Sequence, residues 1–173
     1  MTRVYIEFTR PLGFNLLSWL IRFFQMTSFS HVRLRWNLKN RQEVIYEAAG
    51  SNVRFLGELA QLDKPVKICK TYCMELTDNE YRQLLNKAIE LAGIEYGAFQ
   101  LLRMALFRFF KKKLGTYKNK KTSIVCSELV LYILKESLKL ETDLDPDLAG
   151  PRELDILLDK LYNSKNSVLR LGV

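Results

Sequence analysis

Two segments near the N-terminus alternate polar and apolar residues on either side of a short polar tip. In His31 to Trp36, one histidine and two arginines alternate with valine, leucine and tryptophan, and the second segment runs from Glu43 to Ala48. Lys39-Asn40-Arg41 lies between them. Alternation with a period of two is typical of a half-buried strand. We therefore predict an antiparallel hairpin whose register decides which side chains can meet.

This hairpin carries the only histidine of the chain, His31. Glu47 follows 16 positions later on the second segment. With a tip near Asn40, the two residues lie roughly opposite each other and their side chains leave the same face of the sheet. We expect a helix that begins at Cys126 to pack against that face.

Cys126 opens an apolar run, Cys126 to Leu138, with the spacing of a helix. Thr122 or Ser123 is a candidate cap for its start. A helix N-terminus and a nearby imidazolium both lower the pKa of a thiol. The pattern predicts Cys126 as nucleophile, His31 as general base and acid, and Glu47 as the group that orients the imidazole.

Each of these three residues also has an ordinary structural explanation. A histidine at a strand start is commonly a surface or structural residue, and a cysteine in an apolar helix is commonly a small core side chain. A glutamate on a strand usually faces solvent. The order and setting of the three residues favour the enzymatic interpretation.

The remaining periodicity predicts further strands and helices, and the length of the chain suits one domain spanning residues 1–173. Predicted strands cover 4–8, 53–55, 66–74 and 168–171, and predicted helices cover 15–26, 97–110 and 151–161. A helix from the Thr77 capping box to Gly93 completes the set, with one helical turn at 57–61 and a basic loop at 114–122.

The chain carries a net charge of +8. Part of the excess gathers in a lysine cluster before Cys126: Lys111, Lys112, Lys113, Lys118, Lys120 and Lys121. Such a cluster favours an anionic partner, either a membrane surface or an acidic polymer, and an ordinary solvated loop explains it equally well. Nucleic acid is disfavoured, because helix-core phenylalanines account for the neighbouring aromatic residues.

Several classes are disfavoured by composition. Three cysteines and one histidine offer neither a disulfide framework nor a metal site, and no glycine-rich phosphate loop is present. We expect no metal and no cofactor. No signal peptide and no run of about 20 apolar residues is apparent. We therefore expect a cytoplasmic protein, or one carried in an assembly such as a virion.

Three short motifs resemble those of a known family. They are Ser30-His31-Val32, Tyr46-Glu47-Ala48 and Cys126-Ser127-Glu128-Leu129-Val130. In this order they resemble the circularly permuted branch of the NlpC-type, papain-like cysteine hydrolases, with the YiiX group the best match. The similarity covers roughly residues 4 to 160, including a leading helix at 18–22, Tyr96-Gly97 and a closing helix from Pro151. Arg33 stands where the family usually has a small or apolar residue.

The resemblance implies a papain-like α+β fold, in which an antiparallel sheet carrying His31 and Glu47 packs against a helix that begins with Cys126. It implies the same three catalytic roles. Substrates in the wider superfamily include cell-wall peptides, other amides and lipid acyl groups. We therefore expect a cysteine hydrolase that cleaves an amide or ester through an acyl-enzyme.

Two alternatives remain open at this point. An acyltransferase of the lecithin:retinol acyltransferase type would share the acyl-enzyme and differ in the acceptor. A non-catalytic module would use the lysine cluster to bind nucleic acid or membrane. Tyr96 and Tyr5 are candidates to line the substrate pocket.

Overall fold

A computed structural model describes residues 1–38, 42–57, 65–97, 123–163 and 169–171 of the chain. Its strands are β1 (Thr2–Pro11), β2 (His31–Asn37), β3 (Glu43–Ala49), β4 (Asn52–Gly57), β5 (Val66–Leu76), β6 (Glu95–Tyr96), β7 (Ser123–Ile124) and β8 (Leu169–Leu171). Its helices are α1 (Leu16–Gln25), α2 (Asp78–Leu91), α4 (Cys126–Leu138), the 3₁₀ turn η2 (Pro146–Leu148) and α5 (Pro151–Asn163).

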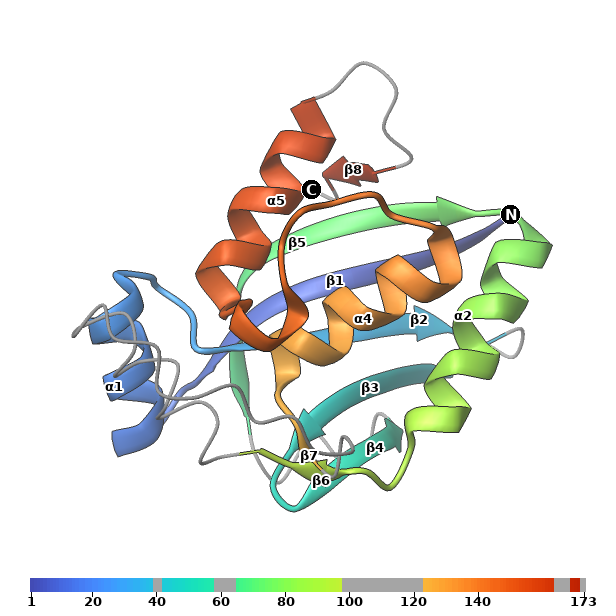
Figure 1. Cartoon of the computed structure of the whole chain (residues 1–173). Helices are drawn as coiled ribbons and strands as arrows, with labels where there is room; N and C mark the ends of the chain where they lie inside the picture. Colours follow the sequence, from blue (N-terminus) through green and yellow to red (C-terminus); the bar gives the residue numbers. More distant parts are fainter. Residues whose placement is uncertain (39–41, 58–64, 98–122, 164–168, 172–173) are drawn as a thin grey trace.

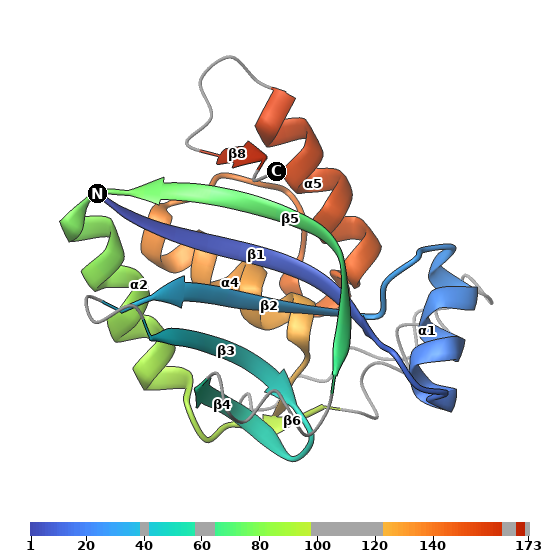
Figure 2. The same ribbon diagram turned by 180° about the vertical axis from the view of Figure 1, so that it is seen from behind.

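Within the described ranges, the strands form one sheet in the order β7-β6-β4-β3-β2-β1-β5-β8. Helices α2, α4 and α5 cover one face, and α1 stands at one end of the sheet, beside the starts of β2 and α4 (Figure 1). Figure 2 shows the opposite face, on which none of the described helices packs. The architecture is α+β, as predicted. The sheet is mixed rather than antiparallel, because β6 and β7 pair in parallel.

Most predicted elements are confirmed, with strands longer than expected. The β2–β3 ladder pairs Leu34 with Tyr46. Thr77 and Glu80 form the predicted capping box at the start of α2, and Gly93 adopts the left-handed conformation just beyond its end. The turn expected at 57–61 lies mostly outside the described residues. The helix at 97–110 and the loop at 114–122 lie outside them except for Gly97.

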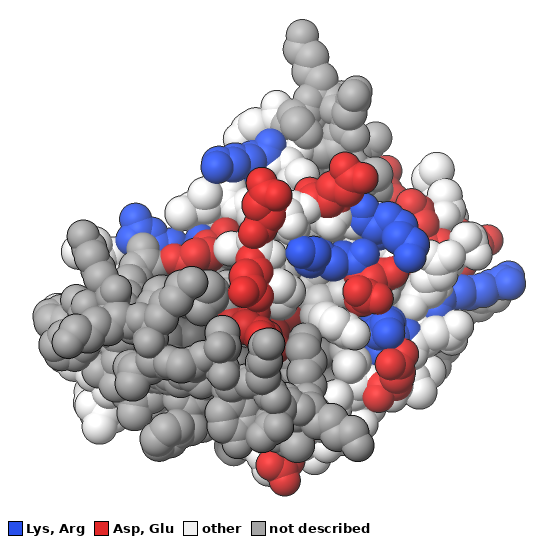
Figure 3. Space-filling model, viewed as in Figure 1, with Lys and Arg blue, Asp and Glu red and all other residues white. Residues whose placement is uncertain are grey.

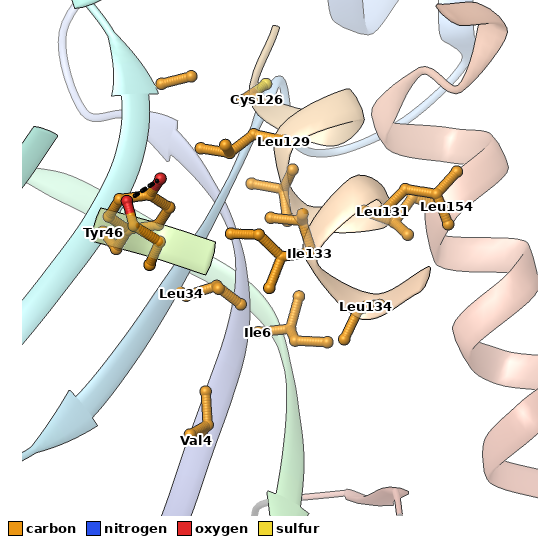
Figure 4. Close-up of a cluster of buried hydrophobic side chains, with 14 of the residues drawn as sticks. Val4, Ile6, Leu34, Tyr46, Cys126, Leu129, Leu131, Ile133, Leu134 and Leu154 are labelled. Atoms are coloured by element: carbon orange, nitrogen blue, oxygen red, sulfur yellow. Dashed lines mark hydrogen bonds between the residues drawn. The ribbon is translucent and has the colours of Figure 1, made fainter. Parts of the chain in front are cut away.

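The core lies between the sheet and α4. Even-numbered side chains of β1 and β2, such as Ile6 and Leu34, meet Leu129 and Ile133 of α4 (Figure 4). Tyr46 on β3 joins this layer and donates a hydrogen bond from its hydroxyl to the Ala88 carbonyl of α2, at 2.9 Å. Because the sequence from Cys126 is apolar on nearly all sides, the whole helix is buried apart from a few side chains.

The expectation that α4 packs against the face carrying His31 and Glu47 is wrong. Side chains alternate across a strand, and α4 contacts the parity of Leu34 and Tyr46. His31 and Glu47 have the opposite parity. His31 reaches Cys126 because each is the first residue of its element, and β2 and α4 begin at the same end of the sheet (Figure 1).

Helix α5 closes the fold against β5. The Tyr72 hydroxyl donates to Asp155 Oδ1 at 2.6 Å and lies 2.8 Å from Asp159 Oδ1, while Lys70 forms ion pairs with both carboxylates. These contacts hold the last helix beside an outer strand. No helix in the described part of the chain is long and apolar enough to cross a membrane.

Candidate active site

Cys126 is the first residue of α4 and is fully buried. The prediction that Thr122 or Ser123 caps this helix is not met for Ser123, which pairs in β7; Thr122 lies outside the described residues. Val125 occupies the cap position and has no polar side chain. Instead, its N–H donates to Glu128 Oε2 at 3.3 Å. The helix start therefore places no capping hydroxyl next to the Cys126 thiol.

His31 binds Glu47 as the hairpin predicted. The distance from His31 Nε2 to Glu47 Oε2 is 2.9 Å, and the two side chains are 20% and 10% exposed. The two residues are diagonal rather than opposite. Continuing the ladder from Leu34–Tyr46 would set Arg33 opposite Glu47, with His31 two positions further. A diagonal pair on one face remains within reach of long side chains.

The same imidazole also interacts with Cys126. Burial alone would lower the pKa of His31, but the Cys126 thiolate and the Glu47 carboxylate outweigh it and raise that pKa to about 10. His31 Nε2 lies against Glu47 Oε2, and the same ring also interacts with the Cys126 side chain. His31 thus joins the carboxylate to the thiol.

The surroundings of Cys126 favour its thiolate. Burial alone would raise the pKa of the thiol, but the His31 charge and hydrogen bond outweigh it and lower that pKa. Backbone hydrogen bonds from Val32 and Ser127 act in the same direction. Val32 follows His31 on β2 and Ser127 follows Cys126 on α4. The backbone of both elements therefore stabilises negative charge on the sulfur, in addition to the imidazolium.

Arg54 is a member of the site that the sequence analysis did not identify. Its Nη2 and Nε lie 2.9 and 3.3 Å from Glu47 Oε1, which leaves Oε2 for His31. Burial alone would raise the pKa of Glu47, but His31 and Arg54 outweigh it and lower the pKa to about 2. The carboxylate is therefore ionised at neutral pH and held on both oxygens.

A sequence signal for Arg54 was present in the turn between β3 and β4. Gly50 has a φ of 70°, and the turn pairs Ala49 with Asn52 and Glu47 with Arg54. Two-residue hairpin turns require positive φ, which glycine adopts without strain. Interpreting Gly50-Ser51 as such a turn would have set Arg54 directly across from Glu47.

The structure places the two tyrosines differently. Tyr96, half-buried on β6, packs with Ile21 and Val125, and the charges of Cys126 and Glu47 add to burial in raising its pKa. Tyr5 is not brought to the site. It pairs with Arg35, whose guanidinium lies 4.4 Å from its ring, whereas His31 pairs with Thr9, four positions along β1. The lysine cluster lies outside the described residues.

A second group of charges occupies the same face of β1 and β2. Fully buried Glu7 accepts from Arg33 Nε at 2.9 Å and from Arg35 Nε through its other oxygen. Arg35 also pairs with Glu43 at 2.8 Å. Arg33 is therefore part of an internal ion-pair network.

No protein-family model and no curated protein gives a significant match to this chain. Among the described residues, no cluster of three or more histidine, cysteine, aspartate or glutamate side chains is placed to hold a metal ion. The candidate site consists of four groups, each in contact with the next: the Cys126 thiol, the His31 imidazole, the Glu47 carboxylate and the Arg54 guanidinium.

Proposed function

We propose that the protein is a cysteine hydrolase of the circularly permuted NlpC-type, papain-like kind, which cleaves an amide or ester bond through an acyl-enzyme on Cys126. The observation that carries the proposal is the position of His31. Its Nε2 lies 2.9 Å from Glu47 Oε2, and its charge and hydrogen bond lower the pKa of the Cys126 thiol. A thiol, a base and a group that orients the base form the arrangement needed for nucleophilic catalysis.

In the acylation step, the Cys126 thiolate attacks the carbonyl carbon of the substrate and a C–S bond forms. The oxygen becomes an oxyanion, which N–H groups at the start of α4 can stabilise. As the tetrahedral species collapses, the C–N or C–O bond breaks. The His31 imidazolium gives a proton to the leaving nitrogen or oxygen, and a thioester remains on Cys126.

In the deacylation step, water attacks the thioester carbon while His31 accepts its proton. The C–S bond then breaks, releasing the carboxylic acid and regenerating the thiolate. His31 is returned to its imidazolium form, so protons balance over the cycle. Glu47 holds the ring in one orientation and stabilises its positive charge, and Arg54 holds Glu47.

The proposal predicts a covalent acyl adduct at a single cysteine. The protein is mixed with p-nitrophenyl butyrate, quenched in acid, and examined by intact-mass and peptide mass spectrometry. We expect a butyryl group on Cys126, and Cys126→Ala should abolish both the adduct and turnover. The matched control is Cys73→Ala, which removes another buried thiol, on β5, and should change neither.

Two outcomes would count against the proposal. An adduct that persists in Cys126→Ala would place the nucleophile elsewhere. A folded parent protein that forms no adduct with any of a panel of activated esters, amides and thioesters would favour the non-catalytic binding module. Thermal unfolding of Cys126→Ala separates loss of the nucleophile from loss of the fold.

The acyltransferase alternative is tested on the same intermediate. Alcohol or amine acceptors are added to the acyl-enzyme, and the ratio of transferred to hydrolysed product is measured against acceptor concentration. A ratio far above that of the free thioester in solution would assign the protein as a transferase. The hydrolase proposal expects water to remain the main acceptor.

A further inference from the structure

Helix α1 is oriented with its polar side chains inward and its apolar side chains outward. The buried positions are Ser18, Ile21 and Gln25. In contrast, Leu16 is 60% exposed, Trp19 45% and Phe23 61%. Surface helices normally turn an apolar stripe to the core and polar residues to solvent. Among the described residues, the outward face of α1 therefore packs against no core.

The exposed apolar side chains extend beyond the helix at both ends. We define the α1 surface by its large exposed residues: Leu12, Phe14, Leu16, Trp19, Phe23 and Met26. The Trp19 and Phe23 rings stack with centroids 5.4 Å apart. By comparison, the described helices α2 and α5 each expose one large apolar residue, Ile89 and Ile156. Exposed large apolar side chains are therefore gathered on α1 and its ends rather than spread evenly over the described helices.

The charges around the α1 surface are all positive in the sequence. Arg10 precedes it and Arg22 lies in the last turn of α1, while no aspartate or glutamate occurs between Glu7 and Glu43. Elsewhere the signs are mixed. On the face seen in Figure 3, the described acidic and basic side chains are interspersed. An apolar surface whose own segment carries arginines and no acidic residue complements an apolar layer covered by anionic groups.

The inward face of α1 is fixed next to the catalytic residues. Ser18 Oγ lies 2.6 Å from Ser30 Oγ, and Ser30 directly precedes His31. Ile21 packs against Val125, which directly precedes Cys126. Whatever the outer face binds is therefore held at the same end of the sheet as the site.

We propose that the α1 surface docks the protein onto an anionic lipid bilayer. Leucine, tryptophan and phenylalanine enter the boundary between headgroups and acyl chains, and Arg10 and Arg22 contact the negatively charged headgroups. A second copy of the chain is the less suitable occupant. Two such surfaces facing each other would bring like charges together, whereas anionic lipid neutralises them. The proposal does not depend on the chemistry of Cys126.

The first measurement is co-sedimentation with vesicles. The full-length protein is mixed with vesicles of phosphatidylcholine alone and of phosphatidylcholine with 30% phosphatidylglycerol. We expect binding to the anionic vesicles that weakens as salt rises. Trp19 provides a second signal. Trp36 is buried, so a blue shift of tryptophan emission and its quenching by brominated lipids would report on Trp19.

The decisive comparison uses matched variants. Trp19→Ser with Phe23→Ser removes two aromatic residues of the α1 surface, and we expect vesicle affinity to fall at least about tenfold. Ile89→Ser with Ile156→Ser removes two exposed apolar residues of α2 and α5 and should leave affinity unchanged. Thermal unfolding verifies that both variants fold.

Three results would overturn the proposal. The first is a parent protein that does not bind anionic vesicles at low salt. The second is equal vesicle binding by both double variants, which would assign binding to another part of the chain. The third is a concentration-dependent dimer in sedimentation velocity that only the Trp19→Ser, Phe23→Ser variant loses, which would assign the α1 surface to a second copy.

Discussion

Glu7 on β1 and Glu47 on β3 are buried carboxylates on the same face of the sheet, and each is bound by two cationic side chains. Glu7 contacts Arg33 and Arg35, which are always charged. Glu47 contacts Arg54 and a histidine. The two clusters are similar in burial and geometry, and they differ in one cation. That difference decides whether the cluster can transfer a proton.

An arginine neutralises a buried carboxylate but has no proton to give at neutral pH. An imidazole can lose and regain its proton, and its second nitrogen is free to serve another group. Because His31 also interacts with Cys126, the Glu47 cluster is connected to the thiol that we propose as nucleophile. An ion-pair network on a strand can therefore transfer a proton only where one of its cations can lose that proton. The Glu7 network, whose cations are both arginines, serves as the comparison without proton transfer.

Among variants of the two clusters, we expect the largest effect from a substitution of Glu7, which should lower the free energy of unfolding. Glu7→Gln removes the carboxylate that the buried Arg33 pairs with, and it leaves Arg35 with Glu43 as its ion-pair partner. We expect a loss of about 3–5 kcal/mol in the free energy of unfolding, measured by urea titration. If the variant still folds, acylation of Cys126 should remain close to the parent rate. A large loss of acylation in a folded Glu7→Gln protein would mean that the two clusters are not independent.

His31→Ala should have the opposite profile. It removes the base and the charge beside Cys126, and we expect the acylation rate to fall by at least about 10²-fold. The pKa of the Cys126 thiol should rise, because its main stabilising charge is lost. Thiolate absorbance near 240 nm against pH measures this in a Cys69→Ser, Cys73→Ala background and needs no reagent to reach a buried sulfur. An unchanged thiol pKa would show that His31 does not stabilise the Cys126 thiolate.

Smaller effects are expected at the residues that orient the imidazole. Glu47→Gln retains a hydrogen-bond acceptor and loses the charge, so acylation should fall by less than in His31→Ala. The pKa of His31 should also fall, because the carboxylate contributes to its elevation. The histidine ring resonances in an NMR pH titration measure that pKa directly. A silent Glu47→Gln would mean that another group orients the ring.

Arg54→Ala extends the same test one contact further. Arg54 is 38% exposed and touches only Glu47 Oε1 within the proposed catalytic set, so the loss of acylation should be smaller than in Glu47→Gln. Arg54→Lys should restore part of it. Since a purely structural role would leave the His31 titration unchanged, a shift of that titration in Arg54→Ala identifies a positioning role. No shift, with unchanged rates, would remove Arg54 from the site.

The smallest effect is the pH dependence that the Cys126–His31 pair gives to stability. The raised pKa of His31 contributes stability below pH 6.5 that is lost as pH rises toward about 10. The lowered pKa of Cys126 contributes stability above pH 9 that is lost as pH falls through the folded value. Where both contributions change with pH their slopes are opposite, so their sum changes less with pH than either contribution alone.

This profile is measured as the difference in unfolding free energy between the parent and the His31→Ala, Cys126→Ala double variant. A weak dependence on pH near neutral pH identifies a pair that shares one proton in both folded and unfolded states. A steady decline across that range would indicate that the thiol stays protonated when the protein folds.

The sequence predicted which residues form the candidate site better than it predicted how the surrounding strands and helices are arranged. Period-two alternation around a tip at 39–41 places His31 and Glu47 on one face when the apolar residues of both strands, such as Leu34 and Tyr46, share the other face. It does not determine their exact offset, and it says nothing of which face a distant helix covers. The position of α4 depends on how the whole core closes over residues such as Leu34 and Tyr46.

The cap of α4 and the contact of Arg54 were missed for different reasons. Hydroxyl residues before Cys126 suggested a side-chain cap, but a short strand competes for the same residues, since Ser123 pairs with β6. Arg54 could be found only by recognising the Gly50 turn, which fixes the β3–β4 register. For the cap of α4, strand pairing of Ser123 overrides its local preference to cap a helix. For Arg54, the glycine turn in the sequence already contained the information needed to predict the contact with Glu47.

The distance in sequence between His31 and Cys126 has a consequence for the life of the protein. Synthesis places His31 on β2 well ahead of Cys126 on α4, and β2 needs α4 to cover its core face. The growing chain therefore contains His31 and Glu47 before the Cys126 thiol exists. Under the proposed function, Cys126 meets its activating imidazolium only when α4 packs on the sheet, so no catalytic site is assembled before that step.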